Sequence, residues 1–396
     1  MKEGYKTLGE FIRQVDIRNT EGKEDNLLGV SVQKQFIPSI ANTVGTDFTK
    51  YKVVKKGQFT YIPDTSRRGD KIAIALLQDY EEGLVSNVYT VFEVIDEEKL
   101  LPEYLMLWFS RPEFDRYARF KSHGSVREVM DWDEMCKVEL PVPSIEKQRN
   151  IVKAYKAITD RIELKRRIND NLEAIAQSVF QEQFASFYRS DELPNGYSFA
   201  GLDSICTVKG GKRLPADCEL LDTPTKHPYI RVRDVGNSRY VCLTDQFQYI
   251  DEETHSAISR YIVNTDDIII SIVGTIGLLG KIHSSLDNAN LTENCVKLTN
   301  IHTVTSDYLY YTLCYKKQAK EIELLTVGAV QAKLPIYNIQ SIKILVPPKE
   351  AIEDFQNKLN VLNEQIEANT IEINKLYELQ SLFLAKLSDK AAKLSF

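Results

Sequence analysis

Residues 359–387 read LNVLNEQIEANTIEINKLYELQSLFLAKL, and this stretch indicates the architecture more strongly than any other. Its apolar residues recur in alternating steps of three and four, beginning with Leu359, Leu362 and Ile366. Such spacing is the a/d pattern of a coiled coil, and it continues for about four heptads with no glycine or proline. We therefore predict a long helix over 348–396 that buries one apolar stripe against a second helix.

The second helix is predicted in the first half of the chain, over 145–189, where the same spacing recurs. Polar residues occupy the middle layers of both stripes, which costs stability but can fix register and partner choice. Each helix could instead pack only on its own domain, but ~40 residues rising ~1.5 Å each span ~60 Å, more than the width of a small domain. The residues expected to pair the helices are Ile158, Ile162, Leu172, Val179, Leu362, Ile366, Leu376 and Phe383.

The repeat extends beyond the helices at one constant offset. Tyr104 corresponds to Tyr308 and Gly124 to Gly328, and in both halves a strand-like run ends at a proline before the long helix. Strand-like runs with few short helices predict an α+β class for each globular part. The predicted organisation is a first domain (1–144), a first long helix with its linker (145–190), a second domain (191–347) and a second long helix (348–396).

Composition limits the classes of protein that the chain can belong to. The 396 residues carry 50 Lys and Arg against 56 Asp and Glu, a net charge of −6, so any nucleic-acid binding must come from local basic patches. The six cysteines form no CxxC pair and the five histidines no HExxH motif, which disfavours zinc and disulfides and fits a reducing cytoplasm. Neither a signal peptide nor a membrane-length apolar run is expected.

Catalytic motifs are missing from the sequence, so we expect a protein that is not an enzyme. The only Pro-Pro pair, Pro347-Pro348, lacks the preceding Asn or Asp and the following aromatic residue of a methyltransferase tetrapeptide. GTIGLLGK (274–281) is one residue too long for a phosphate-binding loop, and we predict a turn between strands there. The acidic run 96–99 is interpreted as a solvated loop, and His123 with Ser125 has no third partner for a triad.

Basic residues cluster with glycines in both halves, and this pattern favours binding to nucleic acid. Glycine would let backbone amides approach phosphates, while Arg and Lys neutralise them. A solvated surface charge is the ordinary alternative for each of these residues, and the two loops that begin at Gly124 and Gly328 are the stronger evidence. The candidate DNA-contacting residues are Arg67, Arg68, Lys71, Ser125, Arg127, Lys212, Arg213, Arg231, Arg233, Gln331 and Lys333.

With these motifs the sequence resembles the specificity subunits of type I restriction-modification systems. The resemblance covers essentially the whole chain and is carried by DIIISIVGTIGLLGKI (267–282) and by two glycine-led segments, 124–148 and 328–350, that run into the long helices. The first half departs from the glycine pattern, because YIPDTSRRGDKIAIALL (61–77) replaces the GTIG turn. The second half lacks the Glu-x-Gln that the first has at 146–148.

The resemblance implies two target recognition domains separated by two long antiparallel coiled-coil helices, with a pseudo-two-fold repeat. Each domain would read one half of a bipartite site in double-stranded DNA, and the helices would set the spacer and dock two modification subunits. It further implies that this chain binds no cofactor: S-adenosylmethionine would be held by the modification subunits, and ATP and Mg by restriction subunits. Because the two halves have diverged, the two half-sites should differ.

Two other functions remain open from the sequence. In one, the chain is a coiled-coil scaffold for protein interaction without DNA sequence specificity, and salt-sensitive binding to duplex DNA would distinguish it from the first hypothesis. In the other, a single-chain enzyme carries both nuclease and methyltransferase activities, which the missing catalytic motifs disfavour.

Overall fold

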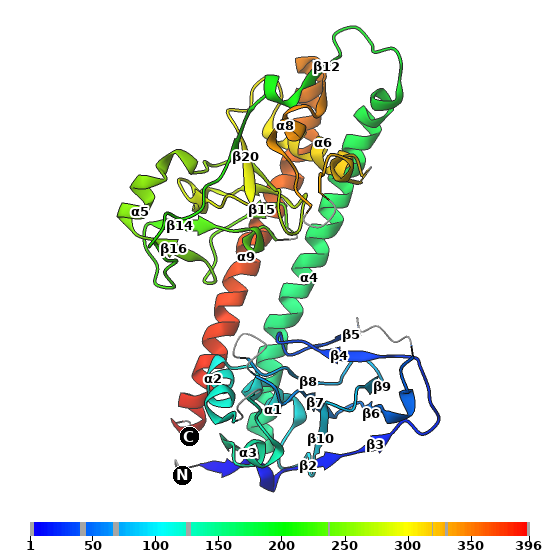
Figure 1. The fold of residues 1–396 in the computed structure, drawn as a ribbon, viewed down its shortest axis with the longest axis vertical. Coiled ribbons are helices and arrows are strands. Elements are labelled where there is room, and N and C mark those ends of the chain that lie inside the picture. The colour runs from blue at the N-terminus through cyan, green and yellow to red at the C-terminus, as the bar shows by residue number, and fades with distance from the viewer. Residues whose placement is uncertain are drawn as a thin grey trace. The chain divides into compact units, whose positions relative to one another are not determined.

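The structure is a computed structural model, and it describes residues 4–39, 45–65, 71–123, 128–236, 238–318, 320–328 and 332–393. The chain divides into two compact units (Figure 1). Unit 1 comprises Met1–Arg161 with Glu378–Phe396, and unit 2 comprises Ile162–Tyr377. Each unit therefore contains one globular part and a segment of both long helices.

Unit 1 is built on small antiparallel sheets, as expected for short strands joined by turns. A four-stranded sheet has the order β2-β10-β7-β8, and a three-stranded sheet has the order β3-β6-β9. The pairs β4-β5 and β1-β11 complete the unit. Its strands are β1 (Tyr5–Thr7), β2 (Ile12–Val15), β3 (Ile17–Arg18), β4 (Leu28–Val30), β5 (Phe36–Pro38), β6 (Lys52–Lys55), β7 (Phe59–Tyr61), β8 (Ile74–Leu76), β9 (Glu82–Val85), β10 (Thr90–Val94) and β11 (Glu139–Pro141), and its short helices are α1 (Pro102–Phe109), α2 (Pro112–Lys121) and α3 (Trp132–Cys136).

Unit 2 has a larger mixed sheet. Five strands follow the order β13-β20-β17-β18-β15, three follow β16-β14-β19, and β12 pairs with β21. Its strands are β12 (Ser198–Gly201), β13 (Thr207–Gly210), β14 (His227–Ile230), β15 (Tyr240–Val241), β16 (Gln248–Ile250), β17 (Ile268–Ser271), β18 (Leu279–Ile282), β19 (Asn290–Leu291), β20 (Cys295–Thr299) and β21 (Lys343–Val346), and its short helices are α5 (Glu252–Ala257), α6 (Ser306–Gln318), α7 (Glu321–Leu324) and α8 (Ile336–Gln340).

The internal repeat predicted from the sequence is present in the hydrogen bonding. The buried Tyr104 hydroxyl donates to the carbonyl oxygen of Pro141 at 3.0 Å. Its counterpart in the second half, Tyr308, donates to the carbonyl oxygen of Leu345 at 2.8 Å. In each unit this bond joins the first helix after the large sheet to the strand that leads into a long helix, so the two α+β parts share one framework.

Both long helices are present: α4 spans Ile145–Phe184 and α9 spans Lys349–Lys393. Within unit 2 they pair antiparallel, because Asn169 contacts Asn369 while Gln183, further along α4, donates to the earlier Asp354 at 2.7 Å. Within unit 1 the direction is the same: the ring centroids of Tyr155 and Phe383 lie 5.7 Å apart, and Gln380 donates to Thr159 at 2.9 Å.

The helix-pairing residues predicted from the sequence stand in different environments. Ile162 and Ile366 are buried, and Leu172 packs beside Ile366 in a small cluster. Val179 and Leu362 pack against the large core of unit 2, and Phe383 packs against that of unit 1. Ile158 and Leu376 are partly buried.

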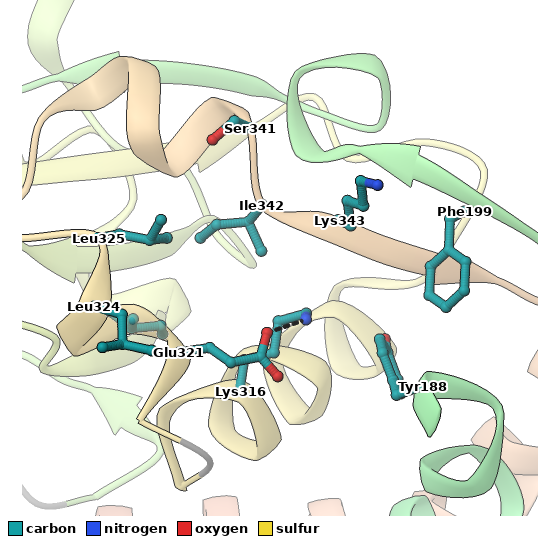
Figure 2. Close-up of a pocket in the computed structure, with 10 residues that line it drawn as sticks. Tyr188, Phe199, Lys316, Glu321, Leu324, Leu325, Ser341, Ile342 and Lys343 are labelled. Carbon is teal, nitrogen blue, oxygen red and sulfur yellow. Dashed lines mark hydrogen bonds and ion pairs between the residues drawn. The ribbon is translucent and has the colours of Figure 1, made fainter. Parts of the chain in front are cut away.

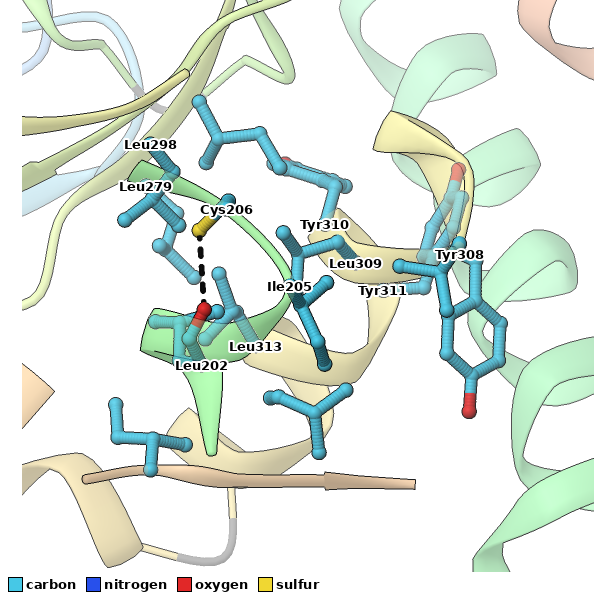
Figure 3. Close-up of a cluster of buried hydrophobic side chains, with 14 of the residues drawn as sticks. Leu202, Ile205, Cys206, Leu279, Leu298, Tyr308, Leu309, Tyr310, Tyr311 and Leu313 are labelled. Carbon is cyan, nitrogen blue, oxygen red and sulfur yellow. Dashed lines mark hydrogen bonds between the residues drawn. The ribbon is translucent and has the colours of Figure 1, made fainter. Parts of the chain in front are cut away.

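The core of unit 2 binds the long helices to the globular part. Leu202, Ile205 and Cys206 pack beneath α6, from which Tyr308 and Leu309 point into the cluster (Figure 3). Phe180 and Phe184 of α4 and Phe355 of α9 meet Tyr308 in the same cluster, with ring centroids 5.1–6.0 Å apart. The ends of the helices are therefore part of the domain core, and their middle segments contact each other.

Gln148 explains why the first half has a Glu-x-Gln at 146–148 that the second half lacks. Its side chain is fully buried, accepts from the Leu101 amide at 2.9 Å, and donates to the carbonyl oxygens of Lys99 and Pro143. It thus holds the segment before α1 against the start of α4. The equivalent residue in the second half is Ile352, which is buried in the apolar core, so the missing Glu-x-Gln reflects a difference in internal packing.

Candidate nucleic-acid interface

One end of the unit 2 sheets gathers several of the residues predicted from the sequence. The Gly211 amide donates to the carbonyl oxygen of Cys295 at 2.9 Å, and the Lys212 amide donates to that of Leu291 at 2.8 Å. The chain leaving β13 therefore runs beside the segment that joins β19 to β20. We call this region the basic end; it comprises residues 210–213, 231–234, 271–278, 290–295 and 332–334.

Gly211 is required at the basic end because the backbones approach each other closely. A Cβ at this position would collide with the carbonyl oxygens of Leu291 and Thr292. The sequence interpretation had glycine exposing its amide to phosphate, and for Gly211 that interpretation is wrong, since its amide is used within the sheet. Lys212 and Arg213 can therefore contribute through their side chains, and both are exposed.

Three arginines at the basic end differ in how firmly they are held. Arg213 is 82% exposed and pairs with Glu293 at 2.7 Å. Arg231 is only 17% exposed, because its amide and its Nε both donate to Asp234 and its guanidinium also bonds Gln248. Arg233 is 61% exposed and lies 3.6 Å from Asp234. Arg231 thus has a fixed orientation, and Arg213 and Arg233 extend toward solvent.

The GTIG segment forms the turn between β17 and β18 that the sequence predicted. Gly274 and Gly277 have φ values of +79° and +78°, in the left-handed region that favours glycine. The buried Ser271 hydroxyl stabilises the turn, because it donates to the carbonyl oxygen of Thr275 at 2.5 Å and accepts from the Leu278 amide at 2.8 Å. The turn is therefore rigid and holds its tip at the basic end.

Lys333 lies beside this turn. It forms isolated bridges with Val273, the residue before the turn, and with Val327, while the Leu334 amide donates to Ile272 at 3.0 Å. Lys333 is exposed, and Gly328 has a φ of +97°. Gln331, predicted on the same loop, lies outside the described residues.

Unit 1 reproduces this pairing, with Val129 and His123 at the repeat offset from Lys333 and Val327. Val129 bridges both His123 and Asp64, as Lys333 bridges Val327 and Val273. Asp64 is therefore the counterpart of Val273 in this pairing, an equivalence that the sequence alone did not establish. Lys71 is exposed, whereas Arg67, Arg68, Ser125 and Arg127 lie outside the described residues.

The sequence analysis missed a buried charge cluster in unit 2. Arg239 has no exposed side-chain surface and donates to Asp307, Asn363 and the Tyr311 hydroxyl. Lys281 also pairs with Asp307, at 2.7 Å. Burial alone would raise the pKa of Asp307, but the charges of Arg239 and Lys281 outweigh it and hold that pKa below its ordinary value. No periodicity marks such a cluster, because its members come from a loop, β18, α6 and α9, which are far apart in the sequence.

Unit 1 contains a simpler buried ion pair. Lys34, between β4 and β5, pairs with Asp115 of α2 at 2.6 Å and donates to the carbonyl oxygen of Ile72 at 2.8 Å. Burial lowers the pKa of Lys34, although Asp115 opposes this effect. Both clusters connect a loop of the strand-rich part to a helix.

The chemistry of the described residues gives no sign of a reactive centre. Burial raises the pKa of the Cys206, Cys242, Cys295 and Cys314 thiols to about 12, so they are protonated at neutral pH. Within the described ranges, no group of three or more His, Cys, Asp or Glu residues is arranged to hold a metal ion. A search of the same residues finds no helix with the length and apolar character needed to span a bilayer.

Comparisons with known proteins agree on one family. The profile described as type I restriction modification DNA specificity domain matches residues 9–174 and 194–381. The MjaIX specificity subunit of Methanocaldococcus jannaschii is 25% identical over 314 residues, covering 74% of this chain and 70% of the relative. The HindI specificity subunit of Haemophilus influenzae is 23% identical over 408 residues, covering 85% of this chain and 86% of the relative. The crystal structure of an S subunit from M. genitalium has the same fold, with a TM-score of 0.51 and 14% identity over 97% of this chain and 95% of that one.

Proposed function

The chain belongs to the family of type I restriction-modification DNA specificity domains, and from this we propose that it is the DNA-reading subunit of such a complex. Each globular part would read one half of a bipartite site in double-stranded DNA. The observation that supports the proposal is the pairing of Val129 and of Lys333 with their neighbours, because the same pair of bridges occurs once in each half of the repeat.

The basic end of unit 2 suits contact with DNA through its side chains. Lys212, Arg213, Arg233 and Lys333 are exposed and can neutralise phosphates. Arg231 is held in one orientation by Asp234, as a residue that contacts a base edge would need to be. The fixed GTIG turn beside Lys333 would give this surface a defined shape.

The chain would supply no catalysis of its own. The relatives are named as specificity subunits, and we propose that methyl transfer and cleavage come from partners in the cytoplasm. Two modification subunits would bring S-adenosylmethionine, and restriction subunits would bring ATP and Mg. The antiparallel helices would dock the modification subunits and set the spacer between the half-sites.

An exchange of recognition domains tests the proposal. Replacing residues 191–347 with the same region of a relative, in cells that also express the modification subunit, should change one half of the methylated motif and preserve the other half. Binding of the purified complex to duplex DNA should weaken steeply with salt. A methylated motif that changes in both halves, or binding that is insensitive to salt, would contradict the proposal.

Lengthening the helices tests their role as a spacer. One heptad added to each helix, near Asn169 and Ile373, keeps the a/d stripe in phase and adds ~10 Å at ~1.5 Å per residue. At ~3.4 Å per base pair, the spacer should grow by about three base pairs while both half-sites stay the same. An active complex that retains the original spacer would leave the helices as a docking surface only.

A further inference from the structure

The two units carry equivalent grooves on their surfaces. The groove of unit 2 has a volume of about 520 Å³ and lies between α6, α7 and the start of β21; Tyr188, Lys316 and Leu324 are among its lining residues (Figure 2). The groove of unit 1 has a volume of about 580 Å³ and lies between the end of α1, α2 and the start of β11. We call them the twin grooves.

Their equivalence is shown residue by residue. Five lining positions of one groove reappear in the other at the offset of the sequence repeat: 117 and 321, 121 and 325, 137 and 341, 138 and 342, and 139 and 343. The edge strands match too, since Tyr5 faces Pro141 and Phe199 faces the equivalent Leu345. Both grooves therefore have an aromatic ring on the edge strand.

An exposed apolar side chain stands at the same position of each repeat. Phe120 is 79% exposed, and its counterpart Leu324 is 83% exposed. They are the two most exposed large apolar side chains among the described residues. Leu324 lines its groove, and Phe120 directly precedes Lys121, which lines the other. Exposure repeated at one site of a duplicated fold indicates a surface that is covered in an assembly.

The charges of the twin grooves favour a protein partner over DNA. The lining of the unit 2 groove includes the cations Lys316 and Lys343 and the carboxylate of Glu321. Lys316 and Glu321 pair at 2.6 Å, and Lys343 has no ion pair within the described part of the chain. The unit 1 groove has three cations and two carboxylates, including the exposed Glu139. Carboxylates beside an apolar surface would repel phosphates. In the unit 2 groove, Lys343 suits a peptide carboxylate, whereas the three cations of the unit 1 groove already pair with Glu113 or Glu134.

We propose that the twin grooves bind the same segment of one partner protein, one copy in each groove. The segment would insert an apolar side chain against Leu324 or Phe120, and in the unit 2 groove it would place a carboxylate near Lys343. The inference rests on the proposed function, in which a modification subunit binds this chain twice. In this proposal the modification subunit contacts the globular recognition domains as well as the long helices.

The two grooves differ at one informative position. Lys343 of unit 2 is replaced by Glu139 in unit 1, at the first strand position of β21 and β11. An acidic segment should therefore bind more tightly to the unit 2 groove, and salt should weaken that site more. Reversing each charge should change the affinities in opposite directions.

The test is the stoichiometry of the complex between the full chain and the purified modification subunit, measured by native mass spectrometry and titration calorimetry. The wild-type chain should bind two copies. Leu324→Glu and Phe120→Glu should each weaken one copy about tenfold or more, because a buried apolar contact is replaced by a charge. Val88→Glu is the matched control, since Val88 is 63% exposed and lies outside both grooves. Lys343→Glu should weaken one site, and Glu139→Lys should strengthen the other.

DNA affinity and thermal melting of each variant complete the experiment. Both should match the wild type, because the substituted side chains are exposed and none of them belongs to the residues that make up the basic end. The inference is overturned if both groove variants bind two copies with wild-type affinity, or if they lose DNA binding while they still bind the partner. A wild-type chain that binds DNA but no modification subunit would instead overturn the proposed partner, and the inference with it.

Discussion

The two units bury a cation in different ways. In unit 2, Arg239 and Lys281 share Asp307, and Asn363 and Gln356 of α9 each donate to the same carboxylate at 2.8 Å. In unit 1, Lys34 meets Asp115 and a single carbonyl oxygen. Lys34 and Arg239 each lie in a segment between two short strands: Lys34 precedes β5 and Arg239 precedes β15.

The difference follows from the chemistry of the two cations. An arginine retains its proton in proteins, so burying Arg239 requires a full set of acceptors and a counter-charge. A lysine can lose its proton when burial becomes too costly, and the pKa of Lys34 is already lowered by burial. Unit 2 therefore still depends on its network at alkaline pH, whereas unit 1 has an alternative there.

The largest effect is expected from Asp307→Ala. It leaves two buried cations without their shared carboxylate, and it should lower the free energy of unfolding by about 3–5 kcal/mol. Chemical denaturation of the full chain measures this loss. Asp266→Asn is the control, because Asp266 also pairs with Lys281 but is 62% exposed, and asparagine tolerates the φ of +69° at this position; the loss of the ion pair should cost no more than about 1 kcal/mol. Equal costs for the two variants would contradict the role given to the buried network.

A smaller effect is expected from Asp115→Ala, at about 2–3 kcal/mol near neutral pH, because Lys34 can become neutral. Removing Asp115 also removes the interaction that raises the pKa of Lys34, so this pKa falls further below its ordinary value of 10.5. Between the lowered folded pKa and 10.5 the unfolded chain binds more protons, so the stability of the variant rises with pH in that window.

Chemical denaturation of Asp307→Ala and Asp115→Ala at a series of pH values, from neutral to alkaline, measures these effects. The cost of Asp115→Ala, relative to the wild type, should shrink as the pH rises. The cost of Asp307→Ala should largely persist, because Arg239 stays charged. If both costs shrink in parallel, the contrast between the two units is wrong.

The polar layer of the helix pair should contribute less than either ion pair. Asn369 is fully buried and donates to Asn169 at 2.8 Å, while its own oxygen accepts from Lys165 at 2.8 Å. Asn369→Ala should cost about 1–2 kcal/mol, because these groups lose partners in a buried layer. Thermal melting monitored by circular dichroism would measure it, with the exposed Glu364→Ala on the same helix as control. A neutral result would show that the remaining contacts of Lys165 with Glu372 and of Asn169 with Thr370 are enough to hold the layer.

Regular patterns made much of the fold predictable. The a/d spacing predicted both long helices, because burial imposes a period on the sequence. The Arg239–Asp307 cluster could not be predicted in this way, since contacts between distant elements leave no period. At the candidate interface, DNA contact by the loop after Gly328 stays a prediction, and the match between Asp64 and Val273 appears only in the strand pairing.

The smallest effect concerns one residue at the candidate interface, where the two units differ in charge. Lys333 and Val129 occupy the same bridging position, and only the first is charged. If this position faces a phosphate, Lys333→Ala should reduce the slope of log affinity against log salt by about 0.9 and weaken binding several-fold at moderate salt. Val129→Lys, in unit 1, should increase this slope by a similar amount.

Titration of duplex DNA at several salt concentrations measures both changes. The control is Lys349→Ala, which removes an exposed lysine at the start of α9. A reduced slope for Lys333→Ala alone would mean that the two units approach DNA differently at this position, and unchanged slopes for both variants would assign the bridge to packing.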